Sequence, residues 1–220
     1  MRVVIAGGHG KIALILERLV SQRGDSVAGF IRNPAQAADL EAVGAEPLVV
    51  DLEQASVDEV ANHLDGADAV VFAAGAGPGS GAARKETVDR DAAILLADAA
   101  EAANVRRYLM VSSTGADANA VDSKDSVFTA YLRAKGAADD NVRARAALDS
   151  TIVRPGHLTN DPGTGRVEIA DQTLRGSIPR EDVAAVLLAA LDAPGTAGQM
   201  FEVISGDTPI ADAVTTSSRG

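Results

Sequence analysis

The sequence predicts an α/β fold, in which a mainly parallel, doubly wound sheet of seven strands is covered by helices on both faces. Short runs rich in Val, Ile and Ala alternate with longer segments of helical periodicity, and the runs are apolar enough to be buried on both sides. We expect strands at Val3–Ala6, Ser26–Ile31, Pro47–Val50, Ala69–Ala73, Tyr108–Val111, Thr151–Val153 and Met200–Ile204.

The segments between these strands have helical spacing, and their order predicts one domain. The expected helices are Lys11–Gln22, Ala35–Val43, Ser56–Leu64, Thr87–Ala103, Ser126–Leu148 and Glu181–Leu191. Val167–Ile169 is a candidate for a further small strand. We expect a single Rossmann-like domain over residues 1–214, with a substrate-side segment at about 155–180. Residues 215–220 are small and polar, which predicts a flexible tail.

The composition excludes several classes of function. The 220 residues include 20 Lys and Arg against 31 Asp and Glu, a formal net charge of −11. Nucleic acids and anionic membranes bind basic proteins, so neither is an expected partner. The chain has no cysteine, and its three histidines do not cluster, so we expect no disulfide, thiolate or metal chemistry. The N-terminus does not resemble a signal peptide, which predicts a cytoplasmic protein.

The turn between the first strand and the first helix has the pattern Gly-x-x-Gly-x-x-Ala. Gly7 permits a tight turn, Gly10 leaves room for a pyrophosphate, and Ala13 lets helix and strand pack closely. The first N–H groups of the helix then face the phosphates. The strand before the pattern and the helix after it favour a dinucleotide site over a purely structural turn. The site comprises Gly7, Gly8, His9, Gly10, Lys11 and Ile12, with His9 a polar loop residue rather than a catalyst.

The end of the second strand indicates which dinucleotide binds. NAD sites usually place Asp or Glu there to hold the ribose hydroxyls, whereas this chain has Arg32 and Asn33. The planar fork of an arginine binds a 2′-phosphate, which favours NADP, with Lys11 as a second candidate contact. The alternative is that Arg32 is a solvated charge. Asp51 and Leu52, after the third strand, either flank the adenine or form a simple turn.

Tyr131 and Lys135 are four residues apart in a helical segment, although the chain has only two tyrosines and four lysines. This spacing places both side chains on one helix face. An ammonium near a phenol stabilises the phenolate, so Tyr131 can exchange a proton with a carbonyl or alcohol. Lys135 can also bind the nicotinamide ribose. The alternative is an ordinary helix-face tyrosine beside a solvated lysine.

Three consecutive hydroxyl residues, Ser112, Ser113 and Thr114, follow the fifth strand. Ligands of open parallel sheets bind at this edge, so one of the hydroxyls is a candidate for orienting a substrate. Strand alternation would point Ser112 and Thr114 to one side and Ser113 to the other. The alternative is ordinary turn chemistry, in which Ser and Thr are common.

In combination these motifs resemble the short-chain dehydrogenase/reductase superfamily, and within it a small atypical NAD(P)-binding group related to NmrA-like and sugar-epimerase-like proteins. The resemblance covers about residues 1–205 in family order. It rests on the segments Gly7–Ala13, Arg32–Pro34, Asp51–Leu52, Ala73–Gly75, Val111–Asp117, Tyr131–Lys135 and Thr151–Gly156.

The resemblance implies further site residues. Thr114 matches the position of the family's catalytic hydroxyl, and Ser113 is the alternative. Ala13 replaces the third glycine of the family's turn, a change that helix packing tolerates. The remaining implied contacts are Ala73, Ala74 and Gly75 on the cofactor, Pro155 and Gly156 beside the nicotinamide, and His157 and Leu158 near the substrate.

These observations predict an NADPH-dependent oxidoreductase that transfers hydride to a small carbonyl or similar acceptor, with Tyr131 as proton donor. Three alternatives stay open: an NADP(H)-sensing protein without turnover, a flavin or quinone reductase that does not need Tyr131, and a sugar-nucleotide epimerase that retains NAD. The expected partner is a small molecule. The chain is expected to be a monomer or a homodimer formed through the two long helices.

Overall fold

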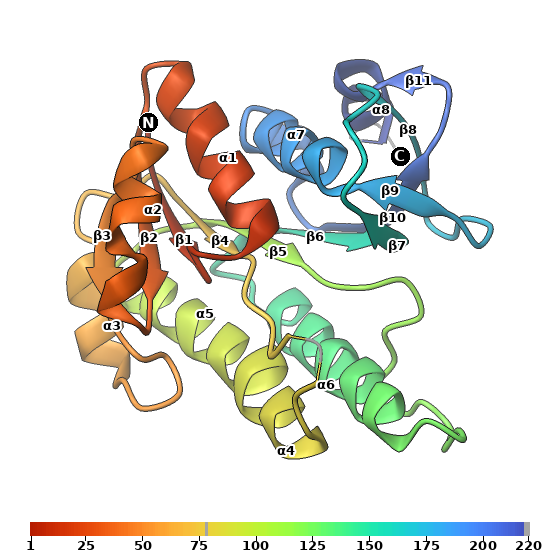
Figure 1. Ribbon diagram of the computed structural model, residues 1–220, viewed down its shortest axis with the longest axis horizontal. Helices are drawn as coiled ribbons and strands as arrows, with labels where there is room; N and C mark the ends of the chain where they lie inside the picture. Colours follow the sequence, from red (N-terminus) through yellow and green to blue (C-terminus); the bar gives the residue numbers. More distant parts are fainter. Residues whose placement is uncertain (78, 218–220) are drawn as a thin grey trace.

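A mostly parallel sheet forms the centre of the computed structural model, which describes residues 1–77 and 79–217 (Figure 1). The strand order is β11-β8-β10-β6-β5-β4-β1-β2-β3. All seven predicted strands are present, with ends that differ by up to two residues. They are β1 (Arg2–Ala6), β2 (Ser26–Ile31), β3 (Glu46–Val49), β4 (Ala69–Phe72), β5 (Arg107–Val111), β6 (Asp149–Pro155) and β10 (Gln199–Ser205).

The prediction of seven strands was wrong, because the main sheet has nine. The additional strands, β8 (Arg166–Ala170) and β11 (Thr208–Pro209), pair antiparallel at one edge. β8 contains the candidate strand Val167–Ile169. Only Val167 of β8 is fully buried and both residues of β11 are exposed, so neither has the continuous apolar run that identified the others. Two short strands, β7 (His157–Thr159) and β9 (Ser177–Pro179), form a separate parallel pair.

The helices form two layers, one on each face of the sheet (Figure 1). Successive residues of β1 alternate between these faces: Val3 and Ile5 pack under α1 and α7, whereas Val4 and Ala6 pack under α3 and α5. The helices of the first layer are α1 (Lys11–Gln22), α2 (Ala37–Ala42), α7 (Arg180–Leu191) and α8 (Ile210–Ser217). The second layer contains α3 (Val57–His63), α5 (Ala92–Ala102) and α6 (Ser126–Arg143).

Two predicted helices have bounds that differ from the structure by more than two residues. The segment predicted at Thr87–Ala103 begins earlier, with α4 (Ala82–Arg84) and a π-helical turn at Lys85–Asp91 that leads into α5. The segment predicted at Ser126–Leu148 ends at Arg143. Residues 215–217 of the predicted flexible tail belong to α8, and residues 218–220 lie outside the described part of the chain. In the described ranges, no helix is long and apolar enough to cross a membrane.

A carboxyl group is buried directly beneath the turn between β1 and α1. Glu17 of α1 is fully buried, and neither of its carboxyl oxygens has a hydrogen-bond partner among residues 1–77 and 79–217. It fills the space over the backbone of Gly8 and Gly29, where an added Cβ would clash with Glu17 Oε1. Burial raises the pKa of Glu17 from 4.5 to about 8, so the folded protein holds this carboxyl protonated at neutral pH.

Replacing Glu17 with glutamine should remove a pH-dependent loss of folding stability. The unfolded chain releases this proton above about pH 4.5 while the folded protein keeps it, so Glu17 destabilises the fold as pH rises toward 8. We expect the free energy of unfolding of Glu17→Gln, relative to that of the parent, to be about 3 kcal/mol higher at pH 8 than at pH 5. Urea unfolding of both proteins at the two pH values measures it. The same difference in unfolding free energy at pH 5 and at pH 8 would contradict a protonated Glu17.

Candidate functional site

The carboxyl ends of the parallel strands meet where the order of the sheet reverses. β1 lies between β2 and β4, and the strands continue outward in opposite directions from it. Ligands of open α/β sheets bind in the crevice at such a reversal. The loops that leave β1, β4 and β5 at this edge carry three of the predicted groups: Gly7–Ile12, Ala73–Gly75 and Ser112–Thr114.

The glycine turn has the geometry that a bound phosphate requires. Gly7 has a φ of +82°, and a Cβ added there would lie 2.6 Å from Cα of Ala74. Gly10 is the N-cap of α1, where no side chain caps the helix and the first turn holds no acid. The first amides of α1 and the positive end of its dipole are therefore available to an anion. Ile12 is buried in the core, so it offers the site its backbone only.

A pocket of about 280 Å³ extends from this turn to the ends of β2 and β3. Its lining includes Gly7 and Ala74 together with four predicted cofactor residues, Arg32, Asn33, Asp51 and Leu52. Asn33 and Asp51 shape the walls, because Asn33 Oδ1 accepts from the Ala35 amide and Asp51 Oδ1 from the Glu53 amide. The pocket therefore has the position and lining expected for the adenosine end of a dinucleotide.

The side chain of Arg32 is 56% exposed and forms an ion pair with Glu53, at 2.9 Å between Nη1 and Oε2. His9, at the same end of the crevice, is held between Asp39 (2.7 Å) and Gln36 (2.9 Å). These two hydrogen bonds engage both ring nitrogens of His9, which favours a structural role in the loop over a catalytic one.

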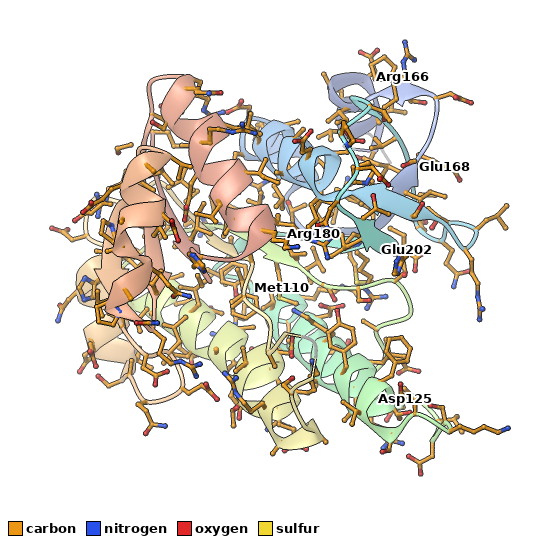
Figure 2. All side chains as sticks on the ribbon, viewed as in Figure 1. Met110, Asp125, Arg166, Glu168, Arg180 and Glu202 are labelled. Carbon is orange, nitrogen blue, oxygen red and sulfur yellow. The ribbon has the colours of Figure 1, made fainter. Side chains whose placement is uncertain are left out.

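A second pocket, of about 380 Å³, lies at the ends of β5 and β6. It collects most of the residues predicted for the nicotinamide and substrate. They are Ser113, Thr114, Tyr131, Pro155, Gly156, His157 and Leu158, and they are joined by Ser112, Phe128 and Arg180. A third pocket, of about 520 Å³, shares Thr114, Phe128 and His157 with it and reaches Leu174 and Glu202. Figure 2 shows Arg180 and Glu202 at the β7–β9 end of the crevice.

The spacing of Tyr131 and Lys135 suggests that the lysine ammonium lies beside the tyrosine, but the structure shows other partners for that ammonium. The ammonium of Lys135 is buried and contacts Asp89 (3.4 Å) and the carbonyl oxygens of Val111 (3.1 Å) and Ala74 (3.4 Å). The cation over the Tyr131 ring is Lys85, whose Nζ is 5.4 Å from the ring centroid. Lys135 thus ties together the loops after β4 and β5, and Lys85 supplies the ammonium over the Tyr131 ring.

The three hydroxyls after β5 also differ in their partners. Ser112 is buried and donates to Asp139 (2.8 Å), which also accepts from Arg154 (2.7 Å to Nη2). Ser113 donates to the carbonyl oxygen of Thr114 (3.1 Å). Burial raises the pKa of Asp139, and the arginine and serine partly oppose that rise. Ser112 therefore belongs to a buried structural network, which leaves Ser113 and Thr114 as the candidates on the pocket wall.

Sequence reasoning missed the π-helical turn Lys85–Asp91, which contributes two buried charged groups to the site. Asp89 accepts from the Ala76 amide (3.3 Å) and pairs with Lys135, while Lys85 donates to the Gly77 carbonyl (3.0 Å). π-Helical turns are frequent at functional sites. No spacing in the sequence pairs residue 89 with residue 135, so only the fold brings these groups together.

Asn160 was also missed, and it connects the two ends of the crevice. Its Oδ1 accepts from Lys11 (3.3 Å), at the start of α1, and from Arg180 (2.9 Å), at the start of α7. The turn cluster around Asn160 predicted a loop but gave no indication of these contacts. Lys11 therefore lies at the N-terminal end of α1, where it contacts Asn160 rather than Arg32.

Comparison with known proteins shows the family to which this chain belongs. A family model described as NAD(P)H-binding matches residues 7–194. A Bacillus subtilis protein named as the uncharacterized sugar epimerase YhfK is 38% identical over 215 residues, which are 97% of this chain and 99% of that protein.

Two solved structures have the same fold. A Bacillus halodurans protein described as a "putative NAD-dependent epimerase/dehydratase" has a TM-score of 0.89 at 38% identity, with 98% of this chain and 99% of that one covered. The oxidoreductase ylbE of Lactococcus lactis has a TM-score of 0.88 at 24% identity and covers 100% and 98%. The expected membership of an NAD(P)-binding group with sugar-epimerase-like relatives is confirmed, and this chain belongs to the NAD(P)H-binding family.

Proposed function

We propose that the protein is an NADPH-dependent oxidoreductase that reduces a small carbonyl or similar acceptor, with Tyr131 as the proton donor. The observation that carries the proposal is one continuous edge of the sheet. It joins the phosphate-binding turn at Gly7–Gly10, the pocket at Arg32, and the pocket that holds Tyr131 and Thr114. A dinucleotide bound along this edge would be held by residues of both pockets.

The residues present fit such a cofactor. The Gly7 turn leaves the amides of α1 open to a pyrophosphate, and Asp51 and Leu52 line the adenosine pocket. At the other end, Pro155 and Gly156 line the pocket of Tyr131. The exposed guanidinium of Arg32 supports NADP over NAD, because it offers a charged fork at the ribose position where NAD proteins place an acid.

The chemistry that a bound NADPH supplies is a hydride for the electrophilic carbon of the acceptor. Thr114, or Ser113, orients the carbonyl oxygen by a hydrogen bond from its hydroxyl. The phenol of Tyr131 gives its proton to that oxygen as the C–O double bond becomes a single bond, and solvent returns a proton to the phenolate. Lys85, whose ammonium lies 5.4 Å from the ring centroid, stabilises the negative charge left on Tyr131.

A second candidate function is the reduction of a flavin or quinone. The observation that favours it is the stacked pair Phe128 and Tyr131, with ring centroids 6.0 Å apart and an interplanar angle of 27°. Phe128 is 51% exposed on the wall shared by two pockets, where a planar acceptor finds a surface to stack on. This reduction proceeds without a proton from Tyr131, so the two functions differ in their response to loss of that phenol.

Removing the Tyr131 hydroxyl tests the proton donor. We expect Tyr131→Phe to lower kcat with a carbonyl acceptor by 10²- to 10⁴-fold, since a positioned acid contributes about that much. The matched control is Tyr108→Phe in the chain's other tyrosine, which is buried and donates to the Ala93 carbonyl. The control should lose stability and keep its activity. Tyr131→Phe with turnover within twofold of the parent would contradict the assignment, and NADPH oxidation by quinones in that variant would favour the second function.

Removing the Arg32 guanidinium tests the choice of dinucleotide. We expect Arg32→Ala to weaken NADPH binding at least tenfold and to leave NADH binding within twofold, because only NADPH carries the 2′-phosphate. Nicotinamide fluorescence titrations of both cofactors measure the effect. Arg106→Ala is the matched control, since Arg106 pairs with Asp149 at the opposite ends of the strands. Equal binding of NADPH and NADH by the parent would contradict the NADP assignment.

A further inference from the structure

Two arginines from different parts of the chain converge on one carboxylate in the adenosine pocket. Arg32, at the end of β2, lies 2.9 Å from Glu53 Oε2, and Arg84, from α4, lies 2.8 Å from the same oxygen. The other oxygen, Oε1, accepts from the Thr87 hydroxyl at 2.7 Å. Arg32, Glu53 and Arg84 all line the pocket that begins at Gly7. Three positive or hydrogen-donating groups thus surround a single anion.

The geometry of this cluster suits a phosphate as well as a carboxylate. Because a nitrogen of each guanidinium lies within hydrogen-bond distance of one oxygen atom, the two nitrogens are close enough to share one phosphate group. Arg32 is 56% exposed and Arg84 is 42% exposed, whereas Glu53 is 18% exposed. The guanidiniums are therefore open to an entering ligand, and the carboxylate lies behind them.

Glu53 stays ionised at neutral pH. The hydrogen bond from Thr87, followed by that from Arg84 and the charges of Arg84 and Arg32, holds the pKa of Glu53 below its usual value, although burial opposes this. An entering phosphate must then compete with a carboxylate for the same donors. Ion pairs this exposed contribute little to stability, so exchanging one anion for another costs little free energy.

We propose that Arg84 is a second 2′-phosphate contact and that Glu53 is an internal competitor which sets how strongly NADPH is preferred over NADH. This inference rests on the NADP assignment above and extends it to two residues outside the β2 end. In the cofactor-free protein Glu53 holds both guanidiniums in the pocket. When the 2′-phosphate enters, Arg32 and Arg84 transfer hydrogen bonds to it, and Glu53 keeps the bond from Thr87.

The proposal makes opposite predictions for two neighbouring side chains. We expect Arg84→Ala to weaken NADPH binding about tenfold, since one charged contact to the 2′-phosphate is lost. The affinity for NADH should stay within twofold of that of the parent. We expect Glu53→Gln to tighten NADPH binding by threefold or more, because the competing charge is removed. The affinity for NADH should again be unchanged. Arg90→Ala is the matched control: Arg90 belongs to the adjacent π-helical turn, pairs with Asp91 at 2.7 Å, and does not line the pocket.

Calorimetric titrations of these variants with NADPH, NADH, 2′,5′-ADP and 5′-AMP measure the effect, and the last two probes differ only by the 2′-phosphate. Circular dichroism and the unfolding midpoint check that each variant folds, and Arg84→Lys keeps a charge at the site if the alanine variant does not fold.

An NADPH affinity that responds to Arg32→Ala but not to either Arg84 variant overturns this inference alone. A 2′-phosphate that adds nothing to the affinity of the parent overturns the NADP assignment itself. Weaker NADH binding in Glu53→Gln would instead make Glu53 a ribose ligand.

Discussion

The site depends on one close contact, in which the first glycine of the β1–α1 turn packs against the backbone that leaves β4. A Cβ at Gly7 would lie 2.6 Å from Cα of Ala74, and the φ of +82° is itself a conformation that side chains rarely adopt. This contact fixes the start of α1 beside the loop after β4. The amides of α1 and the pockets on both sides of β1 take their positions from it.

Several cations gather around this crevice, although the chain as a whole is acidic. The protein has a net charge of −11, yet Lys11, Arg32, Arg84, Lys85 and Arg180 all lie at this edge of the sheet. Each of the five has an internal acceptor: Arg32 and Arg84 have Glu53, Lys11 and Arg180 have Asn160, and Lys85 has a backbone carbonyl. Because these acceptors hold the cations, the side chains are ordered before a ligand arrives. Because an anionic ligand can replace the acceptors, the region still attracts an anion.

The sheet and the glycine turn after β1 could be predicted from the sequence because both depend on local patterns. Buried parallel strands have continuous apolar runs, and the turn has glycines at fixed positions. The edge strands β8 and β11 could not be counted, because exposed strands lack such runs. The spacing of Tyr131 and Lys135 placed them on one helix, but it could not show that Asp89, 46 positions before Lys135, draws the ammonium away. Contacts such as Lys85 with Tyr131, or Arg84 with Glu53, depend on the path of the chain between β4 and α5, which no local pattern determines.

The most direct test of the account is a calorimetric titration of NADPH into the parent protein and into Gly10→Val. Gly10 is the N-cap of α1, and a branched side chain there would occupy the space that the pyrophosphate needs. We expect the parent to bind one NADPH per chain and the folded variant, checked by its circular dichroism spectrum, to lose this binding. A parent that binds no dinucleotide, or a variant that binds NADPH as tightly as the parent, would contradict a cofactor site at this turn.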